Sequence, residues 1–127
     1  MKSKADLVNG TIRKAESDLQ AAKLCLASKQ ALDVACFHAQ QAAEKYLKAY
    51  LIAKDIDFPF IHNIEKLAAL CATHDDEFKQ MESVGGLLTP FAVSSRYDEE
   101  FWPPLEVAIQ AVEAAEAIKA FVLKRLD

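Results

Sequence analysis

The feature that most constrains the fold is the spacing of apolar residues along the first half of the chain. From Val8 to Leu26 and again from Leu32 to Tyr50, apolar residues recur at alternating spacings of four and three. This rhythm places their side chains on one face of an α-helix. We therefore predict two long helices, at about residues 4–27 and 30–54, which the short link between them should pack antiparallel.

Shorter elements are expected next. Pro59 disfavours helical geometry in the residue before it, so residues 55–62 should form a loop. A short helix is predicted at about residues 63–73, because apolar residues again fall on one face. Either His62 or Asn63 is expected to cap this helix.

The last third of the chain predicts one short helix and one long one. Gly85-Gly86 is expected to be a break. Thr89-Pro90 has the pattern of a capping residue followed by proline at the first helical position, which predicts a helix around residues 90–95. After a loop at residues 96–103, a final helix should run from Pro104 to about residue 125.

These elements add up to an all-α, up-down bundle of four main helices with a short extra helix. The 127 residues form one domain, residues 1–127, and this length suffices for a hydrophobic core. With 52% hydrophobic residues, three Gly and four Pro, the composition is typical of packed helices rather than of a disordered chain. No segment alternates apolar and polar residues as a half-buried strand would.

Charge and cysteine usage exclude several classes of protein. The net charge of −4 argues against a domain that coats nucleic acid nonspecifically, because such domains are basic. Cys25, Cys36 and Cys71 include no Cys-x-x-Cys pair, so we interpret them as small buried residues in a reducing compartment. We expect no signal peptide and no membrane span, and hence a cytoplasmic protein.

Polar residues beside the apolar stripe of the second helix are the first candidates for chemistry. His38, Gln41 and Lys45 are spaced i, i+3 and i+7, so they share one face. Lysine offers charge to a phosphate, and histidine and glutamine offer directional hydrogen bonds to a base. The alternative is an ordinary solvated helix face. Gln40 and Glu44 form an i, i+4 pair on the adjoining face.

A second group of candidates follows the predicted short helix near residue 90. Arg96 offers a planar donor fork for phosphate or carboxylate, and Tyr97 offers a ring for stacking. The alternative is a structural ion pair from Arg96 to a nearby acid. His62 has two possible structural roles, as the cap of its helix or as a hydrogen-bonding partner of the bundle.

Known catalytic motifs are absent from the sequence. There is no P-loop, no GxGxxG, no HExxH and no GxSxG. No histidine stands three residues after a glutamate, so the di-iron signature of four-helix proteins is missing as well. We therefore assign no catalytic residue and expect no metal and no cofactor.

Two segments together resemble the HEPN domain, named for higher eukaryotes and prokaryotes nucleotide-binding. They are Ala35-Cys-Phe-His-Ala-Gln-Gln-Ala-Ala-Glu-Lys-Tyr-Leu-Lys-Ala-Tyr-Leu51 and Leu88-Thr-Pro-Phe-Ala-Val-Ser-Ser-Arg-Tyr-Asp98. Phe58-Pro-Phe-Ile-His-Asn-Ile-Glu-Lys-Leu67 and the alanine- and glutamate-rich final helix resemble the same family and follow its order. The resemblance implies an up-down helical bundle, commonly a homodimer. It also implies a partner, because many prokaryotic members act with a minimal nucleotidyltransferase, often as a toxin–antitoxin pair, and it implies a nucleotide or RNA ligand.

One branch of that family consists of metal-independent ribonucleases, which carry an arginine followed about four to six residues later by a histidine. This chain lacks the motif: the first histidine after Arg13 is His38, and none follows Arg96 or Arg125. The leading hypothesis is therefore a non-catalytic nucleotide-binding module that partners a nucleotidyltransferase.

Two alternatives stay open. In a divergent ribonuclease, His38 would act as general acid or base and Arg96 would stabilise the phosphorane. In a purely structural dimer, the polar row would be a solvated face.

Overall fold

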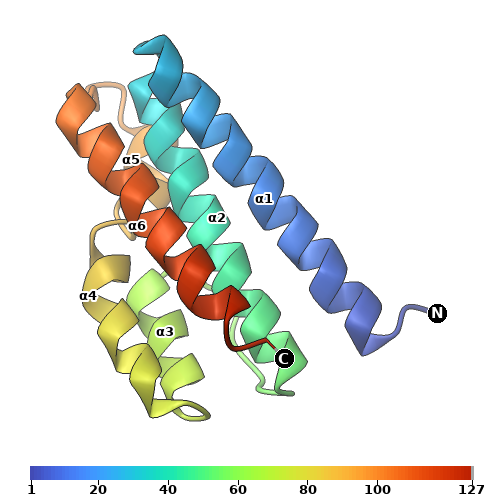
Figure 1. Ribbon diagram of the computed structural model, residues 1–127. Coiled ribbons are helices and arrows are strands. Elements are labelled where there is room, and N and C mark those ends of the chain that lie inside the picture. The colour runs from blue at the N-terminus through green and yellow to red at the C-terminus, as the bar shows by residue number, and fades with distance from the viewer. Residues whose placement is uncertain (127) are drawn as a thin grey trace.

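Three long helices form the frame of the molecule (Figure 1). The computed structural model describes residues 1–126, apart from the side chains of residues 95 and 96. The frame consists of α1 (Lys4–Ser28), α2 (Leu32–Ala53) and α6 (Leu105–Leu123). In Figure 1, α1 runs antiparallel to α2 along much of its length. The all-α up-down bundle and the two long N-terminal helices are confirmed. Within the described residues, no helix has the length and hydrophobicity to cross a membrane.

The ends of α1 are fixed by local chemistry. The Ser3 side chain accepts from the backbone of Asp6, and the Asp6 carboxylate accepts from the Ser3 backbone, which completes a capping box. The helix stops at Lys29, whose φ of 58° is left-handed, and Ala31 follows with a φ of 51°. Two left-handed residues within three positions reverse the chain, although neither is glycine. The tight reversal sets α1 directly beside α2.

The core is centred on α2. Twelve of its 22 residues are buried, against three of the 25 in α1. The apolar stripe predicted from spacing is the buried face, and small side chains along it let the neighbouring helices approach closely. Because α2 lies between α1, α6 and the shorter helices, its polar residues are held among packed elements. The polar residues Gln40 and Glu44 are buried there.

The short helices cover the remaining side of α2. They are α3 (Ile64–Ala72), a 3₁₀ turn η1 (Asp76–Lys79), α4 (Gln80–Gly86) and α5 (Phe91–Tyr97). Asn63 caps α3, since its side chain accepts from the backbone of Lys66. Of the two caps that the sequence left open, asparagine is therefore the one used.

Of two expectations for the last third of the chain, one is confirmed and one is wrong. The break expected at Gly85-Gly86 is where the helix α4 ends, and a Cβ on Gly85 would lie only 2.5 Å from Ile64 Cγ2. Thr89 does not cap α5: its hydroxyl accepts from the Ile64 backbone at 3.1 Å and donates toward the Gly85 carbonyl. Gly85 in α4 and Thr89 in the turn after it thus both contact Ile64 at the start of α3. The helix α5 extends to Tyr97, two residues beyond its predicted end.

Candidate functional site

A cleft of about 590 Å³, lined mostly by polar residues, lies beside α2. Its walls come from three separate segments: the first three turns of α1 with the residues before it, the middle of α2, and the loop between α2 and α3. The residues that line it and carry charge or rings are Lys2, Asp6, Lys14, Glu44, Lys45, Lys48, Phe60 and His62. Because these segments are far apart in the sequence, the cleft exists only in the folded chain.

At the floor of the cleft lies a buried carboxylate, Glu44, which is 4% exposed. Three donors satisfy it: His62 Nδ1 at 2.8 Å, Lys48 Nζ at 2.9 Å and Gln40 Nε2 at 3.0 Å. A carboxylate only accepts, so the proton on His62 is on Nδ1, and Nε2 of a neutral ring is left as an acceptor. Glu44 thereby ties the loop between α2 and α3 to the central helix.

Gln40 and Gln41 extend this network. The Gln40 side chain also donates to the His62 carbonyl at 3.1 Å, and Gln41 donates to Gln40 Oε1 at 2.7 Å. Gln40 is fully buried and Gln41 is half-buried. A buried polar group is tolerated where its hydrogen bonds are satisfied, and this network meets that condition for Gln40 and Glu44.

A second carboxylate, Asp18, bridges α1 and α2. His38 Nδ1 lies 2.8 Å from one of its oxygens, and Lys45 Nζ bonds to the other. The Asp18 side chain is 13% exposed, so the Asp18–Lys45 ion pair is stronger than it would be in open solvent. Lys45 also lines the cleft. Asp18 therefore fixes the position of one cleft lysine from outside the cleft.

The five residues predicted from sequence as nucleotide-binding fall in different places. Gln41 and Lys45 line the cleft, whereas His38 is outside its lining and faces Asp18. Tyr97 is 71% exposed on α5, which Figure 1 places toward the end of the bundle where α1 and α2 are linked. The Arg96 side chain lies outside the described residues. The structure thus brings Gln41 and Lys45 together in one cleft and holds His38 beside Lys45.

Several cleft residues were missed by sequence reasoning. Lys2 and Lys14 come from α1 and the segment before it, and no local motif links them to α2. Phe60 follows a proline in a predicted loop, which is a weak signal. The only sequence signal for the hydrogen-bond network around Glu44 was the i, i+4 spacing of Gln40 and Glu44. Because this polar pair lies beside an apolar stripe, helix geometry holds it near the core.

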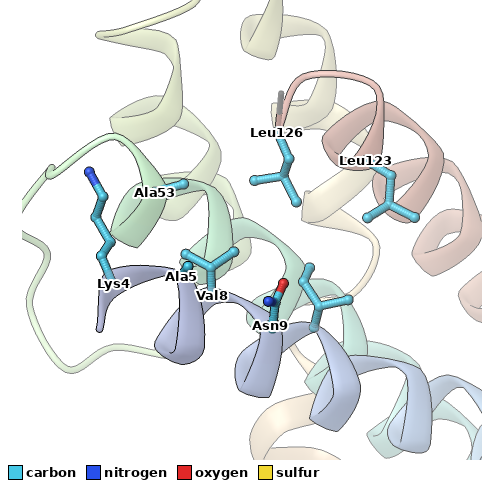
Figure 2. A pocket seen from close by; sticks show the side chains of 8 residues that line it. Lys4, Ala5, Val8, Asn9, Ala53, Leu123 and Leu126 are labelled. Carbon is cyan, nitrogen blue, oxygen red and sulfur yellow. The ribbon is translucent and has the colours of Figure 1, made fainter. Parts of the chain in front are cut away.

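A second cleft, of about 480 Å³, is apolar (Figure 2). Figure 2 shows Val8 of α1 on one side and, on the other, Leu123 at the end of α6 and Leu126 beyond it, with Lys4 at the rim. Lys4 Nζ is paired with Asp55 at 2.9 Å. This cleft offers shape and hydrophobic surface but no arrangement of groups for chemistry.

The buried hydroxyl and thiols are not nucleophiles at neutral pH. Burial, with Asp33 nearby, raises the pKa of Cys36 to about 11, and burial raises the pKa of Cys71 to about 12. Burial, and secondarily Glu16, also raises the pKa of Tyr46. Since the thiolate is the reactive form, the two buried thiols are inert. All three cysteines are free, and the described part of the chain holds no cluster of three metal-ligating side chains.

Fold and cleft together define a class: a small all-α domain whose central helix carries a satisfied polar network beside a lysine-lined cleft. The family model of the HEPN domain matches residues 8–126. The chain belongs to the HEPN domain family.

Solved structures share this fold. The chain is similar to TT1696 from Thermus thermophilus, with a TM-score of 0.80 and 27% identity over 92% of this chain and 96% of that one. It shares its fold with ST0689, described as an archaeal HEPN homologue, with a TM-score of 0.77 and 24% identity over the full length of both chains. No curated protein matches the sequence.

Proposed function

We propose that this chain is a non-catalytic nucleotide-binding module and that the cleft between α1 and α2 is its binding site. The observation that carries this proposal is the local charge of the cleft. Four lysines line it against two carboxylates, Asp6 and Glu44, in a chain whose net charge is −4. A cation-rich cleft on an acidic protein favours a phosphate-bearing ligand over a nonspecific polyanion.

Each polar residue has a proposed role in that cleft. Lys45 and the α1 lysines bind phosphate, and Gln41 offers its amide to the base. His38 acts indirectly, because it shares Asp18 with Lys45 and so helps to hold that lysine in place. Arg96 and Tyr97 are proposed to contact a part of the ligand that extends beyond the cleft.

The test is a calorimetric titration with AMP, ADP and a short single-stranded RNA. We expect saturable binding that weakens roughly tenfold in Lys14→Ala and in Lys45→Ala, as for loss of one charge-assisted hydrogen bond. Lys66→Ala, which removes an exposed lysine outside this cleft, is the matched control. Absence of heat with every ligand, or equal affinities in all four proteins, contradicts the proposal.

The proposed assembly is a homodimer that partners a minimal nucleotidyltransferase in a toxin–antitoxin system. Membership of the family supports it, and so do large exposed side chains on α5 and the loop after it: Val93 is 62% and Trp102 74% exposed. Exposed apolar groups that gather on one region favour a protein contact. Light scattering should give twice the chain mass, and a Trp102→Ser/Val93→Ser variant should dissociate. A monomeric wild type contradicts the dimer.

A second candidate function, a divergent ribonuclease, is favoured by one observation. His62 stands in the cleft with Nδ1 held by a buried carboxylate, an arrangement that orients Nε2 as a general base. Under this reading His62, rather than His38, would deprotonate a ribose hydroxyl. Cleavage of single-stranded RNA by wild type that is lost in His62→Ala would establish it, and intact RNA under the same conditions would eliminate it.

A further inference from the structure

The most unusual side chain of the cleft is Phe60. Phe60 is 90% exposed, although phenylalanine is among the residue types most often buried. It lies in the loop between α2 and α3 and lines the same cleft as the four lysines. A large apolar ring that is kept in water beside a cluster of cations needs a physical reason.

The ring of Phe60 is held on one side by polar groups. Lys48 Nζ lies 5.2 Å from the Phe60 ring centroid and 5.8 Å from that of Phe58, within reach of a cation–π interaction. The ring of His62 meets Phe60 edge-on, with centroids 5.7 Å apart and planes at 73°. These contacts position the ring without covering it.

Both of these neighbours are fixed by the same buried carboxylate. Lys48 Nζ and His62 Nδ1 bond to the two oxygens of Glu44, at 2.9 Å and 2.8 Å. Glu44 belongs to the central helix and is 4% exposed, so the support is rigid. Phe60 is therefore preorganised in an exposed position, which lowers the entropic cost of binding a flat partner.

We infer that Phe60 is a stacking platform for an unpaired nucleobase, and that the cleft takes a nucleotide unit with its base on this ring and its phosphate on the lysines. The inference rests on the proposed function and extends it. An apolar peptide would have to remove the lysines from water without pairing them, which costs free energy. In a nucleotide, the base matches the Phe60 ring and the phosphate matches the lysines, so one ligand satisfies both parts of the cleft. A base inside a duplex has no free face, so the ligand is a free nucleotide or a single strand.

The experiment places a fluorescent reporter on the platform. Trp102 is the only tryptophan, so a Phe60→Trp/Trp102→Phe protein reports on position 60 alone. Titration with AMP or a short oligoadenylate should quench its fluorescence, because a base stacks on the indole. Ribose 5-phosphate, which has no base, should bind by calorimetry without quenching. Tighter binding of the oligoadenylate identifies a single strand as the ligand, and equal binding identifies a free nucleotide.

A pair of substitutions separates the inference from the proposed function. Phe60→Ala and Phe60→Leu should weaken AMP binding roughly tenfold, as expected for the loss of one base–aromatic stack, and should leave ribose 5-phosphate unchanged. If both variants bind AMP like wild type while Lys14→Ala does not, stacking is refuted and the phosphate site stands. If wild type binds none of these ligands, the proposed function fails and the inference fails with it. Circular dichroism checks that each variant is folded.

Discussion

At the scale of the residue, Glu44 is the centre of the molecule's polar chemistry. It is buried on the central helix, and three donors from two segments converge on it. Removing water from a carboxylate costs several kcal/mol, and the hydrogen bonds from these partners replace the lost hydration. The position of the loop that carries His62 and Phe60 depends on the same bonds.

Replacing this carboxylate should therefore destabilise the fold. Glu44→Gln keeps the shape of the side chain but removes the charge that His62 and Lys48 share. We expect the free energy of unfolding to fall by about 1–3 kcal/mol, the usual cost of unsatisfied buried partners, as measured by urea denaturation. Glu113→Gln, at an exposed position of α6, is the control and should change stability by no more than about 0.5 kcal/mol. Equal stabilities of the two variants would show that the network contributes nothing.

At the scale of the element, two helical glycines differ in the space around them: one could accept a side chain and the other could not. Gly10 lies on the exposed side of α1, and a Cβ there would meet nothing within 4 Å. Gly85 closes α4, where a Cβ would lie 2.5 Å from Ile64 Cγ2 and 3.1 Å from Ile64 Cβ. Ile64 is fully buried, so it has no room to withdraw.

The same substitution should act in opposite directions at these positions. Gly10→Ala should stabilise the protein by about 0.5–1 kcal/mol, because alanine loses less backbone entropy in a helix. Gly85→Ala should destabilise it by about 1–3 kcal/mol through overpacking against α3. Thermal or denaturant unfolding of the two single variants measures both. A stable Gly85→Ala protein would mean that α3 and α4 are not packed as closely as described.

The sequence predicted elements well where periodicity is long. The apolar stripes of α1 and α2 each contain six residues spaced three or four apart. Tertiary packing buries the helix face that each stripe defines. The helix α4 was not predicted because it has only seven residues, although the break expected at Gly85-Gly86 is where it ends. Thr89 was misread as a cap because its partner, the backbone of Ile64, is 25 residues away. Local patterns do not contain such partners.

At the scale of the whole molecule, the cleft could be predicted only in part. The i, i+3, i+7 row on α2 correctly brought Gln41 and Lys45 to one surface, since that geometry belongs to a single helix. The loop residue Phe60 and the α1 lysines join them through the packing of α1 on α2, which spacing alone does not reveal. The role of Asp18 was likewise not predicted, yet its carboxylate binds both His38 and Lys45 and so orients them.

Global stability should fall at alkaline pH. The thiols of Cys36 and Cys71 have pKa values of about 11 and about 12 in the fold, against a reference value of 9.0. Above pH 9 the unfolded chain therefore releases protons that the folded chain keeps, so unfolding becomes more favourable as pH rises toward 11. Each thiol contributes a slope of about 1.4 kcal/mol per pH unit.

A double variant, Cys36→Ala/Cys71→Ala, tests this assignment. Its stability at pH 7 should be lower because of the lost packing, but its decline between pH 9 and 11 should be shallower than that of wild type. Urea denaturation at several pH values measures the two slopes. Parallel curves would assign the alkaline loss to other groups, of which the buried Tyr46, whose pKa is also raised, is the first to examine.

The central claim is that one lysine-lined cleft binds the nucleotide, and mapping of amide chemical shifts by NMR during titration with AMP tests it most directly. The account predicts that the largest changes fall on residues 2–14, 41–48 and 58–62, the segments that contain the cleft residues. Changes confined to α5 and the loop after it, or no changes at all, would contradict the claim.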